Sequence, residues 1–359
     1  MAGTPVIELI DSTGNMGMYN SVAVDSNNCV HIAYMDGTNH DLRYATNSGG
    51  AWSTSTIDSE GSVGQHVAIA VDSHIHVHIV YQGQDGWSFC HATNSSGSWT
   101  IRTIDNPNVG LYPSIAVDSE DNLHVSYYDF TNWDLKYATY VGGSWSTYTI
   151  DSGGNVGQGT SIAVDSNDNV HISYMNQSWY GLKYATNTGG TWNVSVVDNL
   201  GCGSTSIAVD SNDAIHIICQ DWTNGGSRYA TNAGGNWTIQ ALCEQGILDN
   251  YDSMVIDSSN CIHMSGYNST GKGLEYATNA GGTWSAFNLD GDCSVGYQTS
   301  IAVDSTGTTH ISYYDFANYD LKLATFSDVT IPEFPSVFAI VLGSICLVTF
   351  ISMARRKRC

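Results

Sequence analysis

The segment "SIAVDSNDNVHISY", residues 161–174, decides the fold of this 359-residue chain, because near-copies of it recur along the sequence. Each copy keeps one aspartate and a histidine six residues later. The aspartates lie 45 to 47 residues apart, a period typical of a β-propeller. They are Asp25, Asp72, Asp118, Asp165, Asp210, Asp257 and Asp304.

Each repeat divides into four short segments that read as strands A to D of one blade. In the third repeat these are "PSIAVD", "LHVSYYD", "DLKYAT" and "SWSTYTID", spread over residues 113–151. Gly, Asn, Asp and Ser fill the joints between them, as turns require. No long stretch has an apolar period of 3.6 residues. The composition and pattern therefore predict an all-β fold, a seven-bladed β-propeller of four-stranded blades.

The two ends of the repeat region predict how the ring closes. The seventh repeat runs through "LKLATFS", residues 321–327, and then lacks a strand D. The segment "TPVIELID", residues 4–11, aligns with strand D of the other repeats, with Pro5 in place of their tryptophan. We therefore expect the N-terminal strand to complete the seventh blade, so that the propeller, residues 1–328, is monomeric and has no open edge.

The joint between strands C and D reads "ATNSGGAW" at residues 45–52, "ATNTGGTW" at 185–192 and "ATNAGGTW" at 277–284. Its Asn-x-Gly-x-x-Trp core resembles the Asp-box of sialidase-type (BNR-like) propellers, with Asn in place of Asp. The resemblance spans almost all of the repeat region. It implies the propeller fold, because Asp-boxes are folding motifs that lie away from the catalytic face.

The repeated histidines lie on strand B, where the alternation of side chains points them at a neighbouring blade rather than into the channel. We predict that they are structural, buried and neutral, bonded to a carbonyl or a nearby Asp, Ser or Thr, and that they tie blade to blade. The repeated aspartate is expected to accept backbone N–H groups in the A–B turn. The second repeat adds His74 and His76, a weak metal-binding pattern. The seven histidines are His31, His78, His124, His171, His216, His263 and His310.

Candidate ligand-binding residues fall in the B–C loops. Four of the ten tryptophans lie there, and several loops pair an aromatic residue with an Asp or Asn four residues earlier. Aromatic rings stack on sugar C–H faces, while Asp and Asn bind hydroxyl groups. The alternative is that the Asp side chains only form turns. The candidates are Asp36, His40, Trp87, Asp129, Trp133, Trp179, Tyr180, Asp221, Trp222, Asp315 and Tyr319.

The charge of the chain limits its partners. With 34 acidic and 11 basic residues, its formal net charge is −23, which disfavours nucleic acid and polyanionic sugars. A sialidase needs three arginines around the substrate carboxylate. Outside the C-terminal tail only Arg43, Arg102 and Arg228 occur, at strand positions that cannot converge, so sialidase activity is not expected. No cofactor is expected, although clustered loop Asp residues could hold Ca²⁺.

The C-terminal end predicts membrane attachment. After a linker, residues 329–336, an apolar segment spans 337–354, followed by the basic tail 355–359. This pattern favours a transmembrane helix with the propeller outside the cell. With the preceding "IPEFPS", it resembles the PEF-type sorting signal of archaeal surface proteins, which implies processing by an archaeosortase. The start, "MAGTPVIELID", shows no signal peptide, although an outside location requires one.

These observations predict a cell-surface β-propeller that acts as a non-catalytic binding module for glycans or surface proteins. Two alternatives remain open. One is a carbohydrate-active enzyme, a glycosidase or lyase, that uses loop Asp residues; the other is a structural envelope protein.

Overall fold

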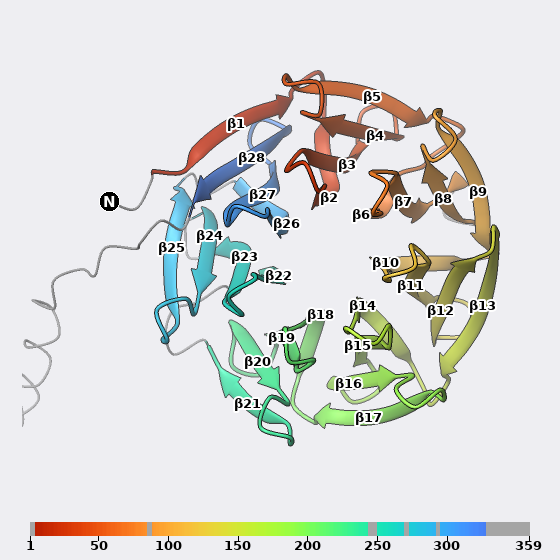
Figure 1. Cartoon of the computed structure of the whole chain (residues 1–359), viewed down its shortest axis with the longest axis vertical. Coiled ribbons are helices and arrows are strands. Elements are labelled where there is room, and N and C mark those ends of the chain that lie inside the picture. Colours follow the sequence, from red (N-terminus) through yellow and green to blue (C-terminus); the bar gives the residue numbers. More distant parts are fainter. Residues whose placement is uncertain (1–3, 85–87, 243–249, 269–272, 292–294, 328–359) are drawn as a thin grey trace, which may run out of the picture.

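The computed structural model describes residues 4–84, 88–242, 250–268, 273–291 and 295–327, and these form a closed ring of seven four-stranded antiparallel sheets (Figure 1). The predicted all-β seven-bladed propeller is thus confirmed. The predicted linker, apolar segment and basic tail lie outside the described residues. Within the described part of the chain, no helix is long and apolar enough to cross a membrane.

Each blade runs from an inner strand A beside the channel to an outer strand D at the rim (Figure 1). Blade 1 contains β2 (Met16–Val24), β3 (Val30–Asp36), β4 (Asp41–Thr46) and β5 (Ser53–Asp58). Blade 2 contains β6 (Gln65–Val71), β7 (Val77–Gln82), β8 (Phe89–Thr93) and β9 (Thr100–Asp105). Blade 3 contains β10 (Val109–Val117), β11 (Leu123–Asp129), β12 (Asp134–Val141) and β13 (Ser144–Asp151). Blade 4 contains β14 (Val156–Val164), β15 (Val170–Asn176), β16 (Gly181–Thr186) and β17 (Asn193–Asp198).

The remaining blades follow the same order. Blade 5 contains β18 (Cys202–Val209), β19 (Ile215–Asp221), β20 (Ser227–Thr231) and β21 (Thr238–Ala241). Blade 6 contains β22 (Asn250–Ile256), β23 (Ile262–Asn268), β24 (Gly273–Thr278) and β25 (Ser285–Asp290). Blade 7 contains β26 (Val295–Val303), β27 (Thr308–Asp315), β28 (Asp320–Ser327) and, from the N-terminus, β1 (Val6–Asp11).

Strand β1 closes the ring as the sequence predicts. It pairs antiparallel with β28, with Val6 opposite Thr325, and forms the outer strand of blade 7 (Figure 1). Its last residue, Asp11, is buried and accepts a hydrogen bond from Tyr34 of blade 1 at 2.6 Å. The N-terminal strand therefore completes one blade and also contacts the next.

The core lies between blades rather than within one sheet. Strand B is buried along its length in blades 1, 3, 4 and 6, and its side chains pack against both neighbouring blades. The repeated tryptophan contributes to these interfaces. Trp99 of blade 2 packs on Tyr44 of blade 1, with ring centroids 5.2 Å apart, and Trp192 packs on Tyr137 at 5.0 Å. These tryptophans serve the blade interfaces, and the loop tryptophans belong to a separate class.

The repeated histidine and aspartate lie side by side in each blade, and in blades 1, 2, 3, 4 and 7 they form a hydrogen bond. In all seven blades the histidine Nε2 lies 3.0 to 3.4 Å from the aspartate Oδ2. A carboxylate only accepts hydrogen bonds, so Nε2 carries the proton. In blade 1 the Nδ1 of His31 then accepts the hydroxyl of Tyr44 at 2.5 Å. The expected aspartate partner is present, but these bonds join strands A, B and C of one blade and do not tie blade to blade.

The aspartate also shapes the A–B turn. Oδ1 of Asp25 accepts the backbone N–H groups of Asn27 and Cys29, both at 2.8 Å. The same bonds recur in the other blades, which confirms the predicted turn role. The repeated segment therefore carries the bonds that shape its own turn and connect strands A, B and C.

Acid should destabilise the protein below about pH 6.5. Burial lowers the pKa of His31, His171 and His216 below the ordinary value of 6.5, and it lowers the pKa of His91 to about 3. As the pH falls through 6.5, these histidines bind protons in the unfolded chain but stay neutral in the folded protein, so the free energy of unfolding decreases. Urea midpoints measured at pH 7.5 and pH 5 should show this loss.

A matched variant tests whether buried histidines cause this loss of stability in acid. His91 bonds to His78 at 3.1 Å, at a position where other blades carry a tyrosine such as Tyr44 or Tyr137. The substitution His91→Tyr should therefore keep the fold and reduce the loss of stability at pH 5. An unchanged loss in this variant would contradict the assignment.

Candidate functional site

The B–C loops form one face of the ring together with the connections between blades. In the five B–C loops that the structure describes in full, those of blades 1, 3, 4, 5 and 7, the loop ends in a residue with left-handed backbone conformation, which is uncommon outside glycine. The φ angles are 65° at Trp133, 57° at Tyr180 and 62° at Tyr319. The backbone there is held on both sides: Trp133 N–H donates to the carbonyl of Asp129, and its own carbonyl accepts Val156 N–H from the next blade. The turn thus directs the loop aromatics outward.

The loop aspartates predicted as ligands are instead part of the loops. Asp36, Asp129, Asp221 and Asp315 are at most 4% exposed. In blade 1 the Asp36 carboxylate accepts the backbone N–H groups of Thr38 and Asn39 and the Asn39 amide at 2.8 Å. The other three repeat this pattern. The turn-forming alternative explains these four residues, because their oxygens are already satisfied and face the protein.

The predicted aromatic residues of blades 4 and 5 come together in a groove of about 470 Å³. Trp179 and Tyr180 from one loop face Trp222 from the next, and the rings of Tyr180 and Trp222 are 5.7 Å apart. These three side chains are 38 to 49% exposed. Leu200, in the connection between the two blades, completes the apolar lining. The groove therefore offers aromatic faces to solvent.

Two glycines explain why these rings lie where they do. A Cβ atom at Gly181 would lie 1.4 Å from the ring of Trp179, and one at Gly203 would lie 2.8 Å from Nε1 of Trp222. Each indole thus covers backbone that carries no side chain. Blades 1, 3 and 7 have Asp41, Asp134 and Asp320 at the position of Gly181. The groove is a feature of blades 4 and 5 and is not a property of the repeat.

The polar groups of the groove are uncharged. Asn199 and Thr223 line it, and Thr223 Oγ1 accepts the N–H of Gly201 at 3.1 Å. The indole N–H of Trp222 donates to Gln220 at 2.8 Å. Aromatic faces beside amide and hydroxyl groups suit a ligand with C–H faces and hydroxyl groups.

The other predicted loop residues lie elsewhere on this face. His40 and Trp133 are exposed, on blades 1 and 3. On blade 7, Tyr319 lies 6.0 Å from Phe316, an exposed residue that the sequence argument did not single out. Trp87 lies outside the described residues. Only Trp179, Tyr180 and Trp222 among the candidates line the groove.

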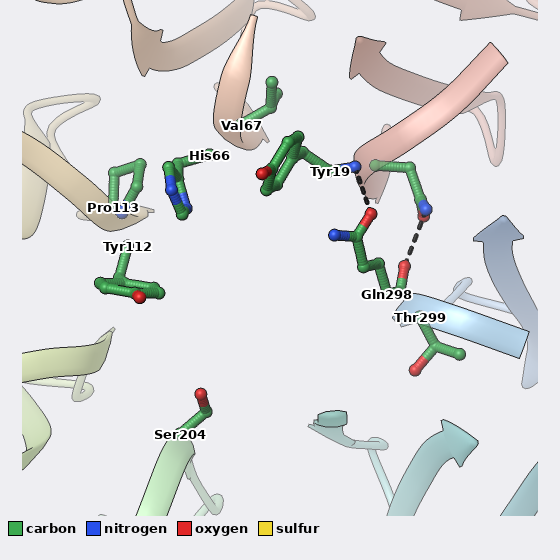
Figure 2. A pocket seen from close by; sticks show the side chains of 9 residues that line it. Tyr19, His66, Val67, Tyr112, Pro113, Ser204, Gln298 and Thr299 are labelled. Carbon is green, nitrogen blue, oxygen red and sulfur yellow. Dashed lines mark hydrogen bonds between the residues drawn. The ribbon is translucent and has the colours of Figure 1, made fainter. Parts of the chain in front are cut away.

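The channel contains a second hollow, of about 250 Å³, that the sequence argument missed (Figure 2). Its lining comes from the inner strands, and Figure 2 shows Tyr19, His66, Tyr112, Ser204 and Gln298 around it. All five stand six residues before the repeated aspartate. The signal was available in the sequence, because this position differs in kind from blade to blade, whereas the segment that begins two residues later is nearly constant.

A bulge in strand A produces this lining. The pairing of strands A and B shifts register just before the conserved segment, for example between Met18 and Ser21. The residues at the bulge have positive φ: 51° at Tyr19, 48° at His66 and 50° at Gln298. Such backbone strain in residues other than glycine is concentrated at functional sites. The channel hollow is therefore a second candidate site.

His66 is the central titratable group of this hollow. Its ring lies between Tyr19 and Tyr112, with centroids 4.9 and 4.8 Å away. His66 is partly buried in the wall of the channel, and this burial lowers the pKa of His66 to about 4. The imidazole is therefore neutral at pH 7 and able to accept a proton.

The three arginines in the described part of the chain are held away from both hollows. Arg43 pairs with Asp11 at 3.2 Å, and Arg102 donates to the hydroxyl of Tyr140 at 3.0 Å. Arg228 is buried between two aspartates of its own and the preceding blade. None of the three lines the groove or the channel hollow.

No protein-family profile and no curated protein matches the sequence. The fold is similar to that of several solved structures. These are a protein of unknown function from Dyadobacter fermentans (10% identity, 91% of this chain and 98% of that one, TM-score 0.55), an ulvan lyase of polysaccharide lyase family PL25 (12%, 90% and 93%, 0.56) and a Hadza microbial sialidase (12%, 79% and 73%, 0.51). At these identities the likeness shows the propeller fold alone.

Proposed function

We propose that this protein is a glycan-binding β-propeller, and that neutral sugars bind in the groove between blades 4 and 5. The observation that carries the proposal is the meeting of Trp179, Tyr180 and Trp222, exposed and directed to one hollow, with uncharged polar groups beside them. Sugar rings stack on such aromatic faces. The structural similarity to a polysaccharide lyase and a sialidase supports a glycan as the ligand class.

The charge of the protein narrows the ligand further. The formal net charge is −23, and none of the residues lining the groove is cationic. An anionic sugar would meet repulsion without a compensating Lys or Arg. The ulvan lyase was solved with a GlcA-containing ligand, so the sugar proposed here differs in charge from that one.

The substitution Trp222→Ala should weaken binding of a neutral oligosaccharide by about tenfold, because the stacking face of the groove is lost. Trp133→Ala is the matched control: Trp133 is 55% exposed in the equivalent loop of blade 3 and does not line the groove. Isothermal titration of both variants against the tightest neutral ligand of the wild type makes the comparison. Equal affinities for the two variants would contradict the assignment of the groove.

A carbohydrate-active enzyme is the second candidate, and one observation favours it. His66 is neutral, lies between two tyrosines and faces the channel hollow in a strained backbone conformation. A neutral imidazole that faces a hollow is a candidate group for proton transfer. The loop aspartates of the original enzyme hypothesis are buried in their turns, so His66 replaces them as the residue on which turnover would depend.

A further inference from the structure

The A–B turn of blade 2 departs from the repeat in a way that the proposed function does not use. It reads "DSHIHVH", residues 72–78, where blade 4 reads "DSNDNVH", residues 165–171. In blade 4 the amide of Asn169 donates to Asp165 at 2.9 Å. In blade 2, Nδ1 of His76 makes the corresponding bond to Asp72 at 2.8 Å. The turn thus needs one nitrogen of His76, and an asparagine supplies the same bond.

The second additional histidine lies beside the first. The rings of His74 and His76 are nearly parallel, at 14°, with centroids 5.8 Å apart. Nδ1 of His74 lies 2.8 Å from Oδ2 of Asp121, which belongs to the A–B turn of blade 3. One ligand atom from each of Asp72, His74 and His76 lies within 4.8 Å of the others. Among the described residues, this is the one group of three such side chains so placed.

We propose that Asp72, His74 and His76 bind a divalent transition-metal ion, with Zn²⁺ as the representative ion, at the A–B turn face of the ring. Two imidazoles and one carboxylate form a ligand set suited to Zn²⁺, whereas Ca²⁺ and Mg²⁺ prefer oxygen ligands alone. Three protein ligands leave the fourth tetrahedral position to water.

The geometry permits coordination with a small movement. Bonds of about 2.0–2.2 Å bring the ligand atoms of a tetrahedral site to roughly 3.5 Å from one another, so the group, whose atoms now lie within 4.8 Å, must contract by up to about 1.3 Å. The Asp72 side chain is 7% exposed and its Oδ2 already accepts from Nδ1 of His76, so the ion would take the place of the proton between these two atoms. The side chains of His74 and His76 are 69% and 36% exposed and are able to turn. Asp121 accepts from Nδ1 of His74, which leaves Nε2 for the metal, the usual carboxylate–histidine–metal arrangement. The ion would then also stabilise the junction of blades 2 and 3.

Zinc titration of the full-length chain in non-ionic detergent tests the proposal. We expect one equivalent of ZnCl₂ to bind, no competition from CaCl₂, and a loss of affinity on the order of 100-fold in a His74→Asn/His76→Asn variant. This variant copies the residues of blade 4 at both positions, so its thermal unfolding without metal should match the wild type. Zinc binding that is absent from the wild type, or that survives in this variant, would overturn the proposal.

A graft into blade 4 provides the reciprocal test. There Asn167 donates to Asp213 of blade 5 at 3.2 Å, in the way that His74 contacts Asp121. An Asn167→His/Asn169→His variant should therefore bind a second equivalent of zinc through Asp165 and the two new histidines. A stoichiometry that stays at one would overturn the claim that these two positions define the site. Sugar binding at the groove, on the opposite face, should not change in either variant.

Discussion

Deleting residues 1–12 should remove most of the stability of the protein, about 5 kcal/mol or more of the free energy of unfolding. The deletion takes away β1, so blade 7 loses its outer strand and the edge of β28 is exposed. It removes buried Ile10, at a cost of about 2–5 kcal/mol. It also leaves Arg43 and Tyr34 without Asp11, and breaking such a buried pair costs about 3–5 kcal/mol.

A shorter deletion separates ring closure from the loss of chain length. Residues 1–5 precede β1, so removing them alone should leave the urea-unfolding midpoint close to that of the full chain. Urea unfolding followed by tryptophan fluorescence measures both variants. A deletion of residues 1–12 that unfolds at the wild-type midpoint would contradict closure of the ring by the N-terminal strand.

The substitution Asp151→Asn should cost about 3 kcal/mol of unfolding free energy, because Asp151 joins two blades. It ends strand D of blade 3 and accepts the hydroxyl of Tyr174 at 2.7 Å and the ammonium group of Lys183, both from blade 4. The side chains of Asp151 and Lys183 are 9% and 11% exposed. Burial acts to raise the pKa of Asp151, but the bonds from Lys183 and Tyr174 hold it below its ordinary value. An amide at this position leaves the buried ammonium without its counter-charge.

Asp58→Asn is the matched control for this substitution. Asp58 ends strand D of blade 1 and accepts the hydroxyl of Tyr81 at 2.6 Å, but blade 2 has Cys90 where blade 4 has Lys183. Because no buried cation loses its counter-charge in this variant, Asp58→Asn should lower the free energy of unfolding clearly less than Asp151→Asn does, as measured by urea unfolding. Equal costs would show that the lysine contributes nothing to the tie between blades.

Much of the fold could be predicted because the same pattern of four strands and turns occurs in seven successive repeats. The spacing of Asp25 and its equivalents gave the number of blades, and the missing strand D after residue 327 gave the closure. What the repeat could not reveal is which blade each bond reaches. The histidine was expected to tie blades together, but its aspartate and tyrosine lie in its own blade, while Asp151 and its equivalents bridge the blades.

The aromatic residues of the candidate site could be predicted from the sequence, but its polar residues could not. Trp179 and Trp222 were distinguishable because they depart from the scaffold tryptophans. The sequence could not tell an aspartate that faces solvent from one such as Asp129, whose carboxylate bonds to its own loop. His66 was missed because it lies on a bulge ahead of the constant segment, where strand A was not expected to continue.

The most direct test of the central claim is a glycan array probed with the full-length wild type and with a Trp179→Ala/Trp222→Ala variant, at several Ca²⁺ concentrations, with analysis of any sugar released. We predict that the wild type retains neutral glycans at every Ca²⁺ concentration, that the double variant loses them, and that no sugar is cleaved. Absence of binding to any glycan, with or without Ca²⁺, would contradict the account. Cleavage that disappears with His66→Ala would contradict it in favour of an enzyme.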